Sequence, residues 1–361
     1  MKKYAAPLLV LALTLAAAVT ARAAAAPVRP LEIYWIDMEG GAGTLIVTPA
    51  GESILVDTGN PTSANQPDSS ASRIHKAAVA AGVSKIDYLI LTHFHMDHFG
   101  GAADLAKLMP IGEVLDNGIP DHDSDGVTNH DAQFAKDILP YRTFKADSRA
   151  IMQVGQAIAL KSASGAAPLS FQCVGARKQV FHLGAGVTNG IDSETTQHAV
   201  DTTDNANSII MLLKFGPFKF FIGGDLTWNM EGKLVCPVNY IGTVDLYQVD
   251  HHGLNLSNNP LLVRALNPTV SVMSNGPRKG ADAETLATLR SVPSIQTMWQ
   301  IHGNLRGTNN VNTDTNYIAN LTANCQGNYI KCSVEPTGKF YTVSIPATGV
   351  SKTYTTAVHR P

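Results

Sequence analysis

The chain has 361 residues, and its 27 Lys and Arg nearly balance its 29 Asp and Glu, leaving a formal net charge of -2. This length is enough to bury a large core within one domain. The even balance and the lack of a long Lys/Arg run argue against a nucleic-acid-binding surface.

Residues 1–25 have the pattern of a secretory signal peptide. Lys2 and Lys3 precede a short apolar stretch, and an Ala-rich tail offers small residues for cleavage. An uncleaved N-terminal anchor is the alternative, although Arg22 interrupts the apolar run. We therefore expect a periplasmic or secreted protein with no membrane span after signal cleavage.

The four cysteines suit an exported protein, because disulfides form in oxidising compartments. Cys325 and Cys332 bracket a short loop and are the favoured pair, and Cys173–Cys236 is a second candidate. Small buried thiols are the alternative.

Hairpins are expected in the first half of the chain, and strand–helix alternation is expected in the second. In chain order, the predicted elements are a strand at 31–37, a hairpin at 43–59, a helix at 72–82, a strand at 86–92, a helix at 100–109, a polar insertion or long loop at 117–150, a hairpin at 208–225, a strand from 246 toward 253, then helix, strand, helix and strand from 260 to 303, and a terminal hairpin at 329–345. This order predicts two mixed sheets packed together with helices outside. The main domain is placed at 31–305, and 306–361 is a C-terminal extension.

The run LTHFHMDHFGG, residues 91–101, follows an apolar strand-like segment and holds three histidines and an aspartate. Side chains alternate at a strand end, so His93 and His95 point the same way and can share one metal ion. Asp97 continues on that side, and His98 can turn back from the following helix toward a second ion. Imidazole and carboxylate ligands favour zinc, with manganese or iron as alternatives.

Two later strand ends carry the same residue types. FFIGGD ends at Asp225, and QVDHHG ends another strand at His251 and His252. Asp225 could bridge two ions, and one of the two histidines could ligate the second. The sequence thus predicts a centre for two divalent cations.

The pattern His-x-His-x-Asp-His, then Gly-Asp, then a late His resembles the metallo-β-lactamase superfamily. The resemblance implies an α+β fold, a four-layer αββα sandwich with two mixed sheets. It also implies metal-ligand roles for these residues: His93, His95, Asp97, His98, Asp225 and His251. LVDTG resembles the superfamily's Asp-Thr-Gly turn, so Asp57 would support the metal loop from beneath. NANSIIMLLKFGPFKFFIGGD and DHHG look most like the branch of competence-protein-type hydrolases and phosphorylcholine esterases.

One departure from the family pattern concerns the first metal. Many relatives supply a third histidine from a Gly-His-Thr segment, but here the matching region reads HAVDTTDNANS. Asp204 or Asn205 could replace that histidine, or His198 could reach in from upstream.

These residues predict an exported metal-dependent hydrolase that uses a metal-bound hydroxide. Asp97 and His252 are the expected catalytic residues, with His252 donating a proton to the leaving group. His302 is a candidate substrate contact. A phosphodiester substrate is favoured slightly. A lactonase or β-lactamase-like hydrolase of cyclic amides or esters is the first alternative, and a non-catalytic binding protein with a degenerate metal site is the second.

Overall fold

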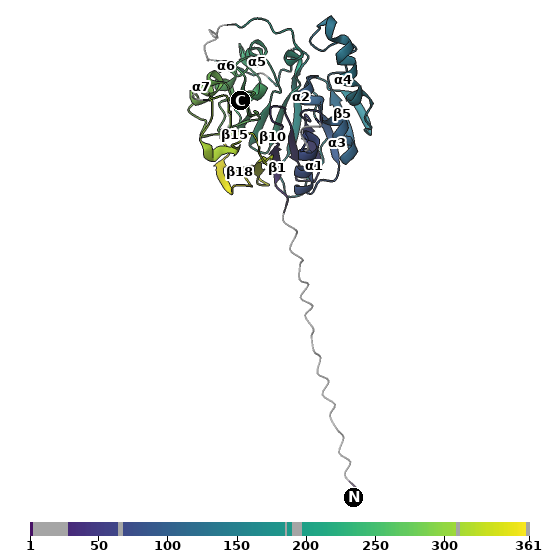
Figure 1. Cartoon of the computed structure of the whole chain (residues 1–361). Helices are drawn as coiled ribbons and strands as arrows, with labels where there is room; N and C mark the ends of the chain where they lie inside the picture. Colours follow the sequence, from purple (N-terminus) through teal and green to yellow (C-terminus); the bar gives the residue numbers. More distant parts are fainter. Residues whose placement is uncertain (3–27, 64–67, 185, 190–196, 308–310, 359–361) are drawn as a thin grey trace.

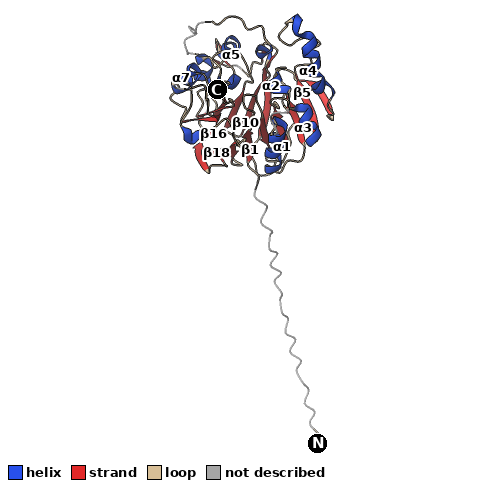
Figure 2. Ribbon diagram, viewed as in Figure 1, coloured by secondary structure: helices blue, strands red, loops and turns tan. Residues whose placement is uncertain are grey.

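Two β-sheets lie face to face, and helices cover their outer surfaces (Figures 1 and 2). This computed structural model describes residues 1–2, 28–63, 68–184, 186–189, 197–307 and 311–358. Most of the predicted signal peptide therefore lies outside the described residues. Within them, no helix combines the length and apolar character needed to cross a membrane.

The first sheet has nine strands among the described residues. In spatial order they are β19 (Val350–Thr355), β18 (Phe340–Ile345), β17 (Ile330–Val334), β1 (Leu31–Trp35), β2 (Thr44–Val47), β3 (Ser53–Val56), β4 (Ile86–Ile90), β5 (Ile111–Asp116) and β6 (Ser148–Ile151). The strands from β19 to β3 pair antiparallel, and those from β3 to β6 pair parallel. The sheet is therefore mixed, as expected.

The second sheet has eight strands among the described residues. In spatial order they are β16 (Ile318–Asn320), β15 (Thr297–His302), β14 (Val270–Met273), β13 (Leu246–Gln248), β11 (Phe218–Ile222), β10 (Ile210–Phe215), β7 (Leu169–Ala176) and β8 (Gln179–Val180). Strands β11, β13, β14 and β15 run parallel to one another. A separate two-stranded ribbon pairs β9 (Val187–Thr188) with β12 (Val238–Asn239).

Helices from the two halves of the chain cover opposite sides of the sandwich. The α-helices are α1 (Ser70–Ala80), α2 (Met96–Phe99), α3 (Ala102–Leu108), α4 (Asp131–Thr143), α5 (Trp228–Val235), α6 (Pro260–Leu266) and α7 (Ala283–Arg290). Short 3-10 turns are η1 (Thr128–His130), η2 (Asp204–Asn207), η3 (Asp250–Gly253) and η4 (Thr315–Tyr317). Helices α1, α3 and α4 pack on the first sheet, and α5, α6 and α7 pack on the second.

The period-2 alternation of the strands divides the hydrophobic core into three layers. In β1, Leu31, Ile33 and Trp35 pack between the two sheets, whereas Tyr34 faces the α1 side. In β10, Met211 points between the sheets and Leu212 faces the α5–α7 side. Both sheets are thus buried on two faces, and the predicted αββα sandwich is confirmed.

Several elements differ from the predictions. The polar insertion at 117–150 contains α4, whose Phe134, Ile138 and Tyr141 pack on the first sheet. Its low amphipathicity hid the helix, since apolar residues are few and one turn contains Pro140. The terminal hairpin is present as β17 and β18, and β17 pairs with β1, so residues 330–355 complete the first sheet. The domain boundary at 305 stays a prediction.

The predicted disulfides are wrong, because all four cysteines are free. Cys332 on β17 and Cys173 on β7 both point between the two sheets. Cys325 lies in the loop before β17 and donates its thiol to Asp37 at 3.1 Å, and Cys236 lies beyond α5, on the outer side of the second sheet. The members of each predicted pair therefore lie in different layers.

Candidate metal centre

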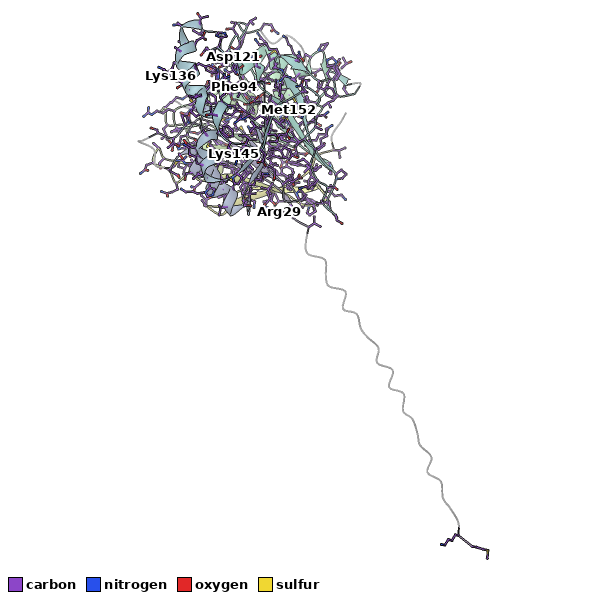
Figure 3. All side chains as sticks on the ribbon, turned by 90° about the vertical axis from the view of Figure 1, so that its right-hand side faces the viewer. Arg29, Phe94, Asp121, Lys136, Lys145 and Met152 are labelled. Atoms are coloured by element: carbon purple, nitrogen blue, oxygen red, sulfur yellow. The ribbon has the colours of Figure 1, made fainter. Side chains whose placement is uncertain are left out.

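The predicted cluster forms where strands of both sheets end. The segment after β4 carries His93 to His98, the residue Asp225 follows β11, and η3 follows β13. His251 N donates to Gly224 O at 2.9 Å, which joins the second and third segments, and Thr92 O of the first segment accepts from Ile209 N, just before β10, at 2.9 Å. Figure 3 shows Phe94, within the first segment, near the end of the molecule opposite Arg29.

Four side chains form the centre of the cluster. One ligand atom from each of Asp97, His98, Asp225 and His252 lies within 4.8 Å of the others. The Nε2 atoms of His98 and His252 lie 3.2 and 3.4 Å from Asp225 Oδ2. The same two atoms lie 3.5 and 3.1 Å from Asp97 Oδ2. Two carboxylates and two imidazoles therefore converge on one small volume.

Hydrogen bonds at the rear of each ring fix which nitrogen faces the cluster. His98 Nδ1 donates to Asp57 Oδ2 at 2.8 Å, and His252 Nδ1 donates to the Ser274 carbonyl at 2.9 Å. A protonated Nδ1 leaves the Nε2 lone pair free to bind a cation. Asp57 also accepts from Thr92 N at 2.8 Å, so it supports the segment from His93 to His98, called the metal loop here, as expected.

Two further histidines face Asp225 from the rim of this group. His251 Nε2 lies 3.4 Å from Asp225 Oδ2, and its Nδ1 contacts Ser257 Oγ at 3.1 Å. His93 Nε2 lies 3.9 Å from the same carboxylate oxygen. Asp225 is thus ringed by imidazoles, which agrees with a bridging position. His252, rather than the predicted ligand His251, reaches both carboxylates.

The backbone explains how neighbouring histidines both face Asp225. His251 and His252 have φ of 51° and 55°, in the left-handed region that non-glycine residues avoid. The turn is held from outside, since Ala281 N donates to His252 O at 3.0 Å and Asp282 N donates to Gly253 O at 2.8 Å. This conformation breaks the alternation of the strand.

His95 lies beside His93, with ring centroids 4.6 Å apart, so the two rings share one side of the segment as predicted. His95 Nε2 contacts Asp125 Oδ1 at 2.9 Å. Asp125 comes from the polar insertion and also accepts from Asp204 N at 2.8 Å. His95 Nε2 is therefore engaged outside the four-residue group.

Two of the three candidates for the missing third ligand, Asp204 and His198, are engaged by other residues. Asp204 accepts from Phe94 N at 2.6 Å and from Asn207 Nδ2 at 2.8 Å, so it supports the metal loop. The Asn205 side-chain oxygen is buried and has no hydrogen-bond partner. His198 is exposed and stacks on Trp228 with ring centroids 4.0 Å apart.

His302 is fully buried at the end of β15, and its Nδ1 donates to the Gly303 carbonyl at 2.9 Å. Its ring lies with Asp37 and Cys325. This position does not support the predicted contact with substrate.

Lys279 is a site residue that the sequence reasoning missed. Its ammonium forms a short ion pair with Asp97 Oδ2, and its side chain is 38% exposed. It lies in an NGPRKG loop with no ligand-type spacing, so only its flanking glycines hinted at a special position. Because it adds positive charge at the open side of the cluster, it can meet an anionic group.

The pKa shifts of these side chains show that the carboxylates of the cluster stabilise positive charge beside them. Burial alone would lower the pKa of His98, but the carboxylates of Asp225 and Asp57 outweigh it and hold that pKa well above its ordinary value. Burial would raise the pKa of Asp225, yet His98 and His252 hold it well below the usual range. Burial and the neighbouring His98 lower the pKa of His93, and burial lowers the pKa of His251 to about 4.

These residues fit a divalent cation. The Nε2 atoms of His93, His98 and His252 are buried without a hydrogen-bond partner. Such orphaned atoms are costly unless something binds them, and a cation among the two carboxylates would satisfy all three. Imidazole and carboxylate donors suit zinc, iron and manganese.

The sandwich and the His–Asp cluster together define a metallo-β-lactamase fold with a candidate divalent-metal centre. In agreement, a family model described as "Metallo-beta-lactamase superfamily" matches residues 39–185, which include the metal loop. A 77-residue segment is 38% identical to a metal-dependent hydrolase of Cupriavidus necator, over 21% of this chain and 23% of that protein. The chain thus spans about a quarter of the length of this curated relative.

Solved structures with a similar arrangement have low sequence identity. CmlA, a diiron β-hydroxylase from Streptomyces venezuelae, is 15% identical with a TM-score of 0.38 over 74% of this chain and 48% of that one. Igni18, a metallo hydrolase from the archaeon Ignicoccus hospitalis, is 14% identical with a TM-score of 0.36 over 75% and 94%. At these values no activity carries over to this chain.

Proposed function

We propose that the protein is an exported metal-dependent hydrolase that acts on anionic esters, with phosphodiesters as the favoured class. The observation that carries the proposal is the convergence of Asp97, His98, Asp225 and His252 within 4.8 Å at the ends of strands from both sheets. The match of residues 39–185 to the superfamily model supports it.

A divalent cation bound there supplies Lewis acidity and an activated water. The residues of the chain supply position and charge. Asp225 Oδ2 faces four imidazole Nε2 atoms and is the natural bridging group. Asp97, with its side chain 19% exposed, is the carboxylate on the open side and can orient a substrate or a water.

Lys279 gives the substrate preference its physical basis. Its ammonium reaches Asp97 from a partly exposed loop, so it can pair with a phosphoryl or carboxylate oxygen that arrives at the cluster. A charged pair of this kind favours phosphodiesters, and the resemblance to the phosphorylcholine-esterase branch favours the same class. Lactones carry no such anion.

His251 and His252 divide the remaining roles. His252 reaches both carboxylates and is the better ligand, while His251 reaches Asp225 alone. We therefore assign cation binding to His252. His251 is neutral near pH 7, because burial lowers its pKa to about 4, so it can accept a proton from the attacking water but does not protonate the leaving group. The ligand role expected of His251 thus passes to His252.

The test is a substrate panel with the purified protein loaded separately with zinc, manganese and iron. Phosphodiesters, phosphorylcholine esters, lactones and β-lactams are compared, together with metal content. Asp225→Ala is expected to abolish hydrolysis and reduce metal content, while Asp104→Ala, which removes a carboxylate on the surface of α3, is the matched control. Full metal occupancy without turnover of any ester would favour a binding protein, and turnover confined to lactones or β-lactams would refute the substrate class.

Export rests on the sequence pattern of residues 1–25. N-terminal sequencing of the protein from the periplasmic or secreted fraction is expected to show a chain that begins near residue 26. An intact Met1 in the cytoplasmic fraction would refute export.

A further inference from the structure

A second group of potential metal ligands lies apart from the cluster described above. Asp37 follows β1, His302 ends β15, and Cys325 lies in the loop before β17. One ligand atom from each lies within 4.8 Å of the others.

His302 keeps an unused ring-nitrogen lone pair, and one of its ring nitrogens lies within 4.8 Å of ligand atoms of the other two side chains. Its Nδ1 donates to the Gly303 carbonyl at 2.9 Å, which leaves Nε2 as the acceptor nitrogen. Nε2 is buried without a hydrogen-bond partner, and the residue is 0% exposed. A buried nitrogen without a hydrogen-bond partner is costly unless something binds it.

The side chains around this group carry a net negative charge, which would stabilise a bound cation. Arg73 of α1 pairs with Asp37, Glu39 and Asp68 at 3.3, 2.6 and 3.0 Å. Lys76 adds only a pair with Asp68. The carboxylates therefore outnumber the cations, and a divalent ion with an ionised thiol would balance them.

We propose that Asp37, His302 and Cys325 form a second, structural metal site that prefers zinc. One carboxylate, one imidazole and one thiolate are zinc donors, and the fourth tetrahedral position is left for water. Zinc ligands at about 2.0–2.3 Å from the ion lie closer together than 4.8 Å, so the three side chains need only a small contraction. On binding, the thiol proton that Cys325 shares with Asp37 Oδ2 leaves to solvent, and Sγ becomes a thiolate ligand.

The site would fasten the loop before β17 to β1 and β15. Gly327 of that loop lies so close to Arg73 that an added Cβ would meet the guanidinium at 2.8 Å. The loop thus packs directly over the ion-pair network, and a metal would link three segments far apart in sequence. Its function is stability rather than hydrolysis.

Cobalt substitution tests the proposal, because a thiolate ligand gives Co²⁺ a charge-transfer absorption that nitrogen and oxygen ligands do not give. The four residues at the centre of the first cluster contain no sulfur. The full chain loaded with Co²⁺ is expected to show the band, and Cys325→Ser is expected to lose it together with one equivalent of metal. Cys236→Ser is the matched control, since this half-buried thiol lies outside the group.

His302→Gln provides an independent variant that keeps the thiol. It is expected to lower the metal content by one equivalent and to leave Cys325 open to alkylation by iodoacetamide in the presence of zinc. In the native protein, zinc is expected to protect Cys325. A charge-transfer band that survives in Cys325→Ser would overturn the proposal in favour of an ordered water. So would equal metal content in all variants, with Cys325 alkylated equally in the native protein and in His302→Gln.

Discussion

Asp57→Asn isolates the support beneath the metal loop. Asp57 is 1% exposed and accepts from Thr92 N at 2.8 Å and from His98 Nδ1 at 2.8 Å. The asparagine keeps the shape and one carbonyl oxygen for Thr92 N, but it places an amide N–H against His98 Nδ1. The His98 ring must then lose that hydrogen bond or move its proton to Nε2, where it blocks the lone pair that faces the cluster.

The expected changes in stability and metal affinity follow from the loss of the hydrogen bond between Asp57 and His98 Nδ1. A hydrogen bond to a charged group contributes about 1.5–3 kcal/mol, so the free energy of unfolding should fall by that amount. Partners of ligand histidines typically change metal affinity about 10–100-fold, which corresponds to about 1.4–2.7 kcal/mol. Both effects should appear in Asp57→Asn.

Competition with a chromophoric chelator measures the metal affinity, and urea unfolding measures the stability. Asp116→Asn is the matched control, because Asp116 is a buried carboxylate that accepts from Tyr141 Oη at 2.9 Å and Gly118 N at 2.8 Å, away from the cluster. It should lose stability and keep metal affinity. Wild-type metal affinity in Asp57→Asn would refute the reasoning about His98.

Three further variants test separate parts of the site and its support. Lys279→Met should raise KM for phosphodiesters about tenfold with a smaller change in kcat, as measured by steady-state kinetics. The control Lys76→Met, which removes a surface ion pair, should change neither constant. His95→Gln should keep the cation bound by the four-residue group, because His95 Nε2 contacts Asp125 instead. A loss of metal content as large as that of Asp225→Ala would show that His95 is needed to bind that cation. Burial raises the pKa of Glu231 to about 7 from 4.5 and also raises that of its neighbour Asp250, so the unfolded chain releases these protons first and stability should fall as pH rises from about 4.5 toward 7. Urea unfolding across this range should show the fall, and Glu231→Gln should flatten it while lowering stability throughout, since Asn258 N and Asn259 N each donate to one carboxylate oxygen; an unchanged slope would refute the assignment.

The sequence was sufficient to bring together the residues that follow directly on strands. His98 and Asp225 could be grouped because each comes shortly after an apolar strand, β4 of the first sheet and β11 of the second, and the two strands end on the same side of the sandwich. The core was also predictable from the sequence, because period-2 alternation along a strand assigns Leu31 and Tyr34 to opposite faces of the sheet.

Residues on loops could not be placed in this way. Lys279 and Asp125 reach Asp97 and His95 from segments whose path depends on tertiary packing. A lysine in a glycine-flanked loop has no periodicity, and an aspartate in a polar insertion resembles any solvated carboxylate. Asp125 contacts His95 Nε2 at 2.9 Å, while the His95 ring lies beside that of His93, as alternation along the strand predicted, with centroids 4.6 Å apart.

The histidine pair in η3 shows why residue spacing alone misassigned the ligand. In an extended strand, His251 and His252 would face opposite sides, and only one could reach Asp225. Two successive left-handed residues cost roughly 1–2 kcal/mol each. Contacts from elsewhere in the chain offset this energy: Ala281 N and Asp282 N donate hydrogen bonds to the turn. Gly280 also packs closely against it, since a Cβ there would lie 2.0 Å from His252 O. The loop at 276–282 therefore both shapes the histidine turn and carries Lys279, so the turn that positions His252 and the lysine that pairs with Asp97 depend on the same segment.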